Sequence, residues 1–379
     1  MATKTTRSFK EILAEYWSYF QASLFPFLVG MVEEPLTAKL EQLVVAWDVV
    51  QIEQHVRSPH EQWLGRPEHD RRKMARAFIA KAVYNIATTE ALIDLLCSHR
   101  ALRRLCGYES VREVPSSATF SRAFEEFARA GLGDLVHKHL VQEHVGDKLV
   151  MHISRDSTEV VARERPAKKE KKETTDKQVV KRGRPKKGEV RAPREEKRLD
   201  VQLRQSAELA LSELSKVCTW GTKKDTGGHL HSWKGYKAHV DWADDNVPLN
   251  VVTTSACVFD NQVAIPMARS TAARITAAYE LMDSAYDAPQ IRQEVADLGH
   301  VAIIDANPRR GGVPEQKLFD PATVQRYKER TTAERGNSRL KDEFGLRHLR
   351  VRGHAKVHMH IMFGVLALFA DQVARPIRG

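Results

Sequence analysis

The first 145 residues carry apolar positions at the three- and four-residue spacing of amphipathic helices. The clearest runs are Arg72–Ala87, Glu90–Cys106 and Ala118–Glu143. Thr88 and Ser116 stand just before the second and third runs, where a side-chain oxygen can cap a helix, and Gly107 follows the second. The pattern predicts an all-helical domain over residues 1–145.

This helical region contains a short helix, a turn and a capped helix rich in Ser, Arg and Thr. Helix-turn-helix DNA readers have this layout, and so do many helical bundles. The sequence therefore leaves two roles open, which are DNA binding and a purely structural or dimerising role.

After residue 147 the pattern changes to short apolar runs that alternate with helical segments. The predicted strands are Lys148–Ser154, Leu230–Asp245, Leu249–Val258, Ala277–Met282 and His300–Asp305. Helices are predicted over Asn261–Ala273, Pro289–Leu298, Tyr327–Lys341 and Lys356–Val373. The second and third strands should form an antiparallel pair. The order predicts a mixed α/β sheet flanked by helices, in a second domain over residues 146–379.

A charged tract at about 163–205 separates the first two predicted strands. Residues 163–198 hold sixteen Lys and Arg against seven Asp and Glu, which is +9 of the chain's net charge of +11. So few apolar residues cannot bury a core, and we expect a flexible insertion. Arg182 and Arg184, in an Arg-Gly-Arg-Pro core, resemble an AT-hook that enters the minor groove; the alternative is a solvated linker.

The charge and hydropathy of the chain narrow its partners and its location. A basic chain favours a polyanion, and double-stranded DNA is the first candidate. A membrane is a weaker one, because no run reaches the ~18 apolar residues that a span needs. No signal-peptide core is present, so we expect a cytoplasmic protein. The four scattered cysteines, Cys97, Cys106, Cys218 and Cys257, indicate reduced thiols and no zinc site.

Four chemically active side chains share one stripe of the predicted helix Tyr327–Lys341. Tyr327, Arg330, Glu334 and Lys341 have offsets of three, seven and fourteen residues, which at about 100° per residue place them within roughly 60° of arc. Such a stripe can hold a metal ion at its carboxylate and phosphates at its cations. The alternative is a solvated face with a favourable Arg330–Glu334 pair.

Two further carboxylates follow apolar strands, where α/β sheets place their sites. Asp156 follows the first predicted strand and Asp283 follows Ala277–Met282. Together with Glu334 they would supply three hard oxygen donors, which suit Mg²⁺ or Mn²⁺. A pair of such ions can activate a nucleophile and stabilise the leaving oxygen of phosphoryl transfer. Taken singly, each aspartate is more typical of a turn or a cap.

These motifs resemble those of a known family. Asp156-Ser-Thr, Asp283-Ser-Ala-Tyr-Asp and Tyr327-x2-Arg330-x3-Glu334-x6-Lys341 are similar to the acidic motifs of bacterial insertion-sequence DDE transposases, the last being their Tyr-Arg-Glu-Lys signature. The resemblance implies a ribonuclease-H-like catalytic fold preceded by a helical DNA-binding domain.

The resemblance also implies the chemistry. Asp156, Asp283 and Glu334 would bind two Mg²⁺ ions, for which Mn²⁺ would substitute, and Tyr327, Arg330 and Lys341 would contact DNA phosphates. Water would cut the element's end, and the freed 3′-hydroxyl would attack target DNA, within a homodimer or higher oligomer. The fifty or so residues between Asp283 and Glu334 leave no room for the large β-rich insertion of some relatives.

The sequence leaves other functions of the protein and other roles of single residues open. A related metal-dependent endonuclease would cut without joining, and a catalytically silent regulator would only bind DNA. The spacing of His354 and His358 could bind zinc, although no matching Glu or Cys stands nearby. Trp220, Trp233 and Trp242 are candidates to hold an unpaired base, with core packing as the alternative.

Overall fold

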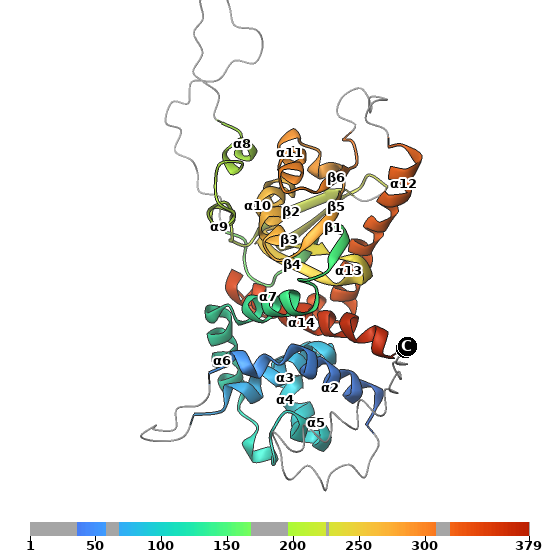
Figure 1. Cartoon of the computed structure of the whole chain (residues 1–379). Coiled ribbons are helices and arrows are strands. Elements are labelled where there is room, and N and C mark those ends of the chain that lie inside the picture. Colours follow the sequence, from blue (N-terminus) through green and yellow to red (C-terminus); the bar gives the residue numbers. More distant parts are fainter. Residues whose placement is uncertain (1–35, 58–67, 168–195, 225–226, 308–318, 379) are drawn as a thin grey trace, which may run out of the picture.

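The computed structural model describes residues 36–57, 68–167, 196–224, 227–307 and 319–378. Most of the N-terminal helices lie on one side of the last helix, α14 (His354–Arg378), and the sheet lies on the other, with α7 on the side of the sheet (Figure 1). These helices are α2 (Ala38–Val50), α3 (Arg71–Val83), α4 (Thr89–Ser98), α5 (Arg100–Leu105), α6 (Ser117–Ala130) and α7 (Leu132–His144), with 3-10 turns at Ile52–His55 and Val111–Glu113.

The predicted caps are confirmed, but two predicted helices are each divided in two. The side chain of Thr88 caps α4 and that of Ser116 caps α6. The run predicted as one helix over Glu90–Cys106 breaks at His99, whose extended backbone lets its ring accept from Leu102 N at 3.2 Å. The run over Ala118–Glu143 breaks at Gly131, whose φ of 63° is readily available to glycine.

The described strands form a mixed sheet. They are β1 (Leu149–Val161), β2 (Thr219–Lys224), β3 (Leu230–Trp242), β4 (Pro248–Ser255), β5 (Thr276–Met282) and β6 (Val301–Ile304). The strand β1 is central, because it pairs antiparallel with β3 and parallel with β5, which in turn pairs parallel with β6. β2 pairs with the first half of β3 and β4 with its second half. This sheet confirms the predicted ribonuclease-H-like fold.

Two details of the sheet differ from the prediction. The first strand does not end at Ser154, because antiparallel pairing with β3 carries it on to Val161. The strand β2 was not predicted. The predicted basic insertion contains the short helix α8 (Arg198–Gln202), and α9 (Ala207–Ser212) follows it. Arg182 and Arg184 lie outside the described residues.

Helices cover both faces of the sheet, as predicted. One face carries α10 (Asn261–Ala272) and α11 (Pro289–Asp297), which are joined by an ion pair between Arg269 and Glu294 at 2.6 Å. The other face carries α13 (Thr331–Asp342) and α14. α13 continues α12 (Pro321–Tyr327) through a 3-10 turn at Lys328–Arg330, so the predicted helix Tyr327–Lys341 is tightened near its start.

The largest hydrophobic cluster joins the N-terminal helices to the sheet through α14. It includes Phe78 and Phe124 from the N-terminal helices, Phe363 and Phe369 from α14, and Val240 from β3. By length and hydropathy, α14 is the one described helix that could cross a membrane, but 83% of its apolar window is buried inside the protein. The burial of α14 in this cluster explains why the sequence of α14 is apolar.

Candidate active site

Asp156 lies in the middle of β1, beyond the last residue of β1 that pairs with β5, which is Ser154. Its side chain faces α13, where Asn337 Nδ2 donates to Asp156 Oδ2 at 3.0 Å. The pKa of Asp156 is raised to about 6, mainly by burial; the charge of Arg330 opposes this rise and the charge of the nearby Asp283 adds to it. Asp156 is therefore a carboxylate whose negative charge is not fully compensated by its surroundings.

Asp283 comes directly after β5 and begins a 3-10 turn, Ser284–Tyr286. Its Oδ1 accepts from the backbone N–H of Ala285 at 2.9 Å. Burial raises the pKa of Asp283, and the Ala285 N–H and the Arg330 guanidinium oppose that rise. Its position at the carboxyl end of a parallel strand is the one predicted.

Glu334 projects from the first turn of α13, and its side chain is 62% exposed. Arg330 Nη1 donates to Glu334 Oε1 at 2.9 Å, while Arg330 Nη2 lies 3.8 Å from Asp283 Oδ2. Arg330 also acts electrostatically on Asp156, whose charge helps to raise the pKa of the guanidinium against the effect of burial. The fold thus brings the three predicted carboxylates around one guanidinium.

These carboxylates fit divalent metal ions by their chemistry. They are hard oxygen donors, and the raised pKa of Asp156 shows that the single Arg330 leaves anionic charge uncompensated. Among the described residues, no three His, Cys, Asp or Glu side chains already stand as a metal cluster. The guanidinium of Arg330 lies among the carboxylates instead.

The other stripe residues also lie beside the sheet ends. Tyr327 Oη donates to the backbone oxygen of Met282 at 3.2 Å, and burial raises the pKa of Tyr327 to about 12, so its hydroxyl stays protonated. Lys341 Nζ lies 3.7 Å from Glu159 Oε1 of β1. Burial lowers the pKa of Lys341, and Glu159 opposes that effect. The stripe therefore runs from the end of β5 to the end of β1.

Two residues close to the carboxylates were not predicted as site residues. Asn337 falls on the stripe, seven residues after Arg330, but a lone Asn on a helix carries no distinctive signal. Its side chain is buried, and its Oδ1 has no hydrogen-bond partner among the described residues. The other residue is Asp260, which precedes α10 and whose Oδ1 accepts a hydrogen bond from Lys237 Nζ at 2.9 Å. In the sequence it resembles an ordinary helix cap.

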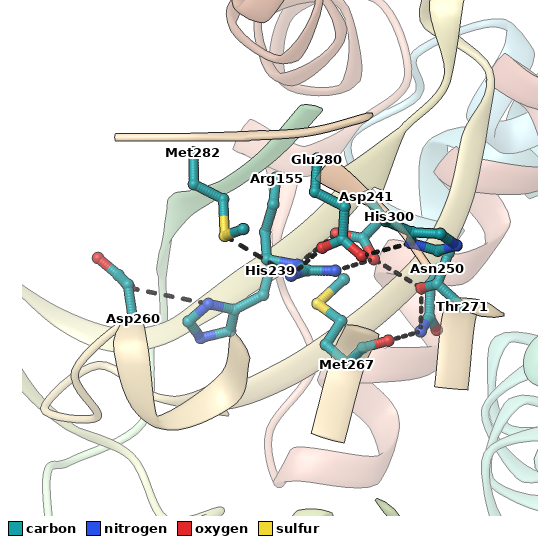
Figure 2. A network of polar contacts seen from close by, with 10 residues as sticks. All are labelled: Arg155, His239, Asp241, Asn250, Asp260, Met267, Thr271, Glu280, Met282 and His300. Carbon is teal, nitrogen blue, oxygen red and sulfur yellow. Dashed lines mark hydrogen bonds and ion pairs between the residues drawn. The ribbon is translucent and has the colours of Figure 1, made fainter. Parts of the chain in front are cut away.

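Arg155, the residue before Asp156, belongs to a buried ionic network that the sequence did not reveal (Figure 2). Arg155 points to the α10 face and donates to Asp241 through Nε at 2.7 Å and Nη2 at 2.9 Å, and to Glu280 through Nη1 at 2.8 Å. Thr271 Oγ1 donates to Asp241 at 2.6 Å, and His300 Nδ1 lies 2.9 Å from Glu280. This network joins β1, β3, β5 and α10.

The two candidate zinc-binding histidines have partners within the fold. His358 contacts Asp134 at 2.9 Å and Thr253 at 2.8 Å, and its ring stacks on His354, so neither imidazole belongs to a metal cluster in the described chain. Trp233 and Trp242 are buried, whereas Trp220 is 59% exposed. All four cysteines are free thiols.

Comparison with known families gave two matches. The family described as Transposase DDE domain matches residues 152–370, which include β1, β5 and α13, and a second family, Transposase domain (DUF772), matches residues 32–126. A comparison with curated proteins gave no match. The chain belongs to the DDE transposases, a catalytic family that acts on DNA and generally uses divalent metal ions.

Proposed function

We propose that this protein cuts the ends of its own insertion sequence and joins them to target DNA by two-metal phosphoryl transfer. The observation that carries the proposal is the convergence of Asp156, Asp283 and Glu334 on Arg330. The carboxylates come from β1, the turn after β5, and α13, three elements that lie far apart in the sequence. A cluster of this kind costs stability unless cations neutralise it, which favours a catalytic role over a structural one.

Asp156, Asp283 and Glu334 would hold the two Mg²⁺ ions, and Mn²⁺ would substitute. Bound there, the ions would activate the attacking oxygen and stabilise the leaving one. The exposed Glu334 gives the site access from solvent, while Asp156 lies deeper and is half-buried.

The protonated and cationic residues of the stripe would position the DNA. Arg330 is already held at the site by its interactions with the carboxylates. Its planar guanidinium would donate hydrogen bonds to phosphate oxygens beside the cut. Tyr327 would donate from its protonated hydroxyl, and Lys341 would supply a point charge farther along the strand. Arg182 and Arg184, in the basic tract, would add backbone or minor-groove contacts.

The remaining parts of the chain would serve assembly. We assign residues 1–145 to DNA binding or dimerisation and residues 146–379 to catalysis, with the basic insertion at about 163–205 between strands. The active form would be a homodimer or higher oligomer on double-stranded DNA, with one subunit at each element end. The protein would act in the cytoplasm of its bacterial host, at the nucleoid.

The test is a cleavage and strand-transfer assay that uses the DNA flanking this gene as substrate, with Mg²⁺ or Mn²⁺. We expect metal-dependent cuts at the element ends and joined products from the wild type, and neither from Glu334→Gln. A matched control is Glu329→Gln, which makes the same chemical change at an exposed position of the same helical segment and should stay active.

The alternatives predict different products. Cuts without joined products would identify a metal-dependent endonuclease. DNA binding without cuts, together with equal behaviour of wild type and Glu334→Gln, would identify a catalytically silent regulator and refute the proposal.

A further inference from the structure

The strands β2 and β3 continue beyond the main sheet as a two-stranded ribbon. β1 pairs with β3 only from Gly235 to Trp242, whereas β2 pairs with β3 from Leu230 to Gly235. In the outer part of the ribbon, residues 222–224 and 230–232 are all exposed. A hairpin alone is marginally stable in water. A ribbon with both faces open is therefore suited to contact a partner.

The base of the ribbon is firmly anchored to the sheet. Trp233 is buried, and its indole Nε1 donates to the backbone oxygen of Tyr236 at 3.2 Å. Opposite it stands Gly221, where a Cβ would come within 2.5 Å of the Trp233 ring. The ring of His231 stacks on Trp233 with 6.2 Å between centroids. These contacts fix the direction in which the ribbon projects.

The ribbon carries cationic and aromatic side chains. Residues 219–224 and 227–234, the described part, include Lys223, Lys224 and Lys234 and contain no Asp or Glu. Lys223 pairs in register with His231, and the exposed Trp220 pairs with Lys234. Lysines bind backbone phosphates, and a two-stranded ribbon is narrow enough to enter the major groove of DNA.

The ribbon lies beside the acidic centre. His231 Nε2 is 3.3 Å from Glu159 Oε2, and the other oxygen of Glu159 is 3.7 Å from Lys341 Nζ. Burial raises the pKa of Asp156, and the charge of Lys223 is among those that oppose this rise. Lys223 is thus close enough to act on both Asp156 and Lys341 electrostatically. Glu159 thus links the ribbon to the stripe, because its two oxygens face His231 and Lys341.

We propose that the β2–β3 ribbon is a DNA-binding arm that holds backbone phosphates of the duplex whose phosphodiester lies at the acidic centre. Lys223 and Lys224 make the phosphate contacts, which extend the contact of Lys341 away from the cut. This inference rests on the proposed function, because it requires that DNA occupies the site.

The test compares the salt dependence of DNA binding, measured by fluorescence anisotropy with end-containing duplex and full-length protein in EDTA. The double variant Lys223→Ala/Lys224→Ala should bind more weakly, and the slope of log K against log salt should fall by about 1.8, since each phosphate contact contributes about 0.9. Lys223→Arg/Lys224→Arg should restore the slope. Thermal unfolding of each variant verifies that it is folded.

A matched control removes the same charge elsewhere. Lys148 and Lys216 are exposed and lie outside the ribbon, so Lys148→Ala/Lys216→Ala should leave the slope near that of the wild type. Equal slopes for the ribbon variant and the wild type, or equal losses in the ribbon and control variants, would overturn the ribbon proposal. Failure of the wild type itself to bind DNA would instead refute the proposed function.

Discussion

Arg155 and Asp156 are neighbours on one strand, yet they lie in opposite electrostatic surroundings. Arg155 points toward α10, and its guanidinium is hydrogen-bonded to two carboxylates that are themselves bonded by Thr271 and His300 (Figure 2). Asp156 points toward α13. Only Asn337 donates a side-chain hydrogen bond to it among the contacts described, and burial raises its pKa to about 6.

The difference separates charges that are paired within the fold from a charge that is paired only in part. The side chains of Arg155, Asp241 and Glu280 are completely buried and mutually paired, so their charges are satisfied within the folded chain. The charge of Asp156 is satisfied only in part. A bound ligand can neutralise the rest of such a charge, and carboxylates with perturbed pKa values are therefore candidates for functional sites.

The largest expected effect is loss of cleavage in Asp156→Asn. Loss of a metal-binding carboxylate should remove several kcal/mol of transition-state stabilisation, which lowers the cleavage rate by about 1,000-fold or more. DNA affinity should stay within a few-fold of wild type, and thermal unfolding without metal should not worsen. Retained cleavage, or a parallel loss of DNA binding, would contradict the assignment of Asp156.

Arg155→Met should give the opposite result, a loss of stability. Removing the guanidinium leaves Asp241 and Glu280 buried without their cation, which should lower the free energy of unfolding by about 3–5 kcal/mol. Urea titration followed by circular dichroism measures this quantity. If Arg155→Met unfolded like the wild type, the network would not be the structural element that its contacts indicate.

Asp156 and Glu280 should also have opposite effects on how the free energy of unfolding depends on pH in the absence of metal. Because folding raises the pKa of Asp156 from 3.8 to about 6, its stabilising contribution is present below pH 3.8 and is lost as the pH rises through 6. The free energy of unfolding of Asp156→Asn, relative to that of the wild type, should therefore rise by about 2 kcal/mol between pH 4 and pH 7. This figure allows for the partial exposure of Asp156.

Glu280 should behave in the reverse sense. Burial alone would raise its pKa, but Arg155 and His300 outweigh burial and lower the pKa below 4.5. Its contribution is present above that pH and is lost as the pH falls. The free energy of unfolding of wild type and Glu280→Gln, measured by urea titration at several pH values, should therefore converge at low pH. A constant gap between them would refute this linkage.

The smallest effect concerns Asn337, which contacts Asp156 without being a predicted metal ligand. Asn337→Leu keeps much of the volume but removes the donor, and outer contacts of this kind typically change metal affinity by about 10–100-fold. Mn²⁺ binding measured by electron paramagnetic resonance would report the loss directly. Asn337→His, which can still donate, should recover part of it, whereas equal affinities of wild type and Asn337→Leu would assign Asn337 to packing alone.

Much of the fold could be predicted because each element carries its own periodicity. The strand Thr276–Met282, the helix Asn261–Ala272 and the antiparallel pair of β3 and β4 lie close to their predicted positions. Errors arose where a distant partner or a single backbone angle decided the outcome. β1 extends to Val161 because β3 pairs with it, and Gly131 divides a helix whose apolar pattern is continuous.

The chemical groups of the site could be identified from local periodicity and motif spacing. They are the carboxylates Asp156, Asp283 and Glu334, and a helical stripe whose spacing places Tyr327, Arg330 and Lys341 on one side. Folding was needed to show that Arg330 lies among the carboxylates, that Asn337 contacts Asp156, and that Arg155 has two buried partners. Apart from the Arg330–Glu334 pair, those facts depend on contacts between residues 47 to 181 positions apart, which no local pattern encodes.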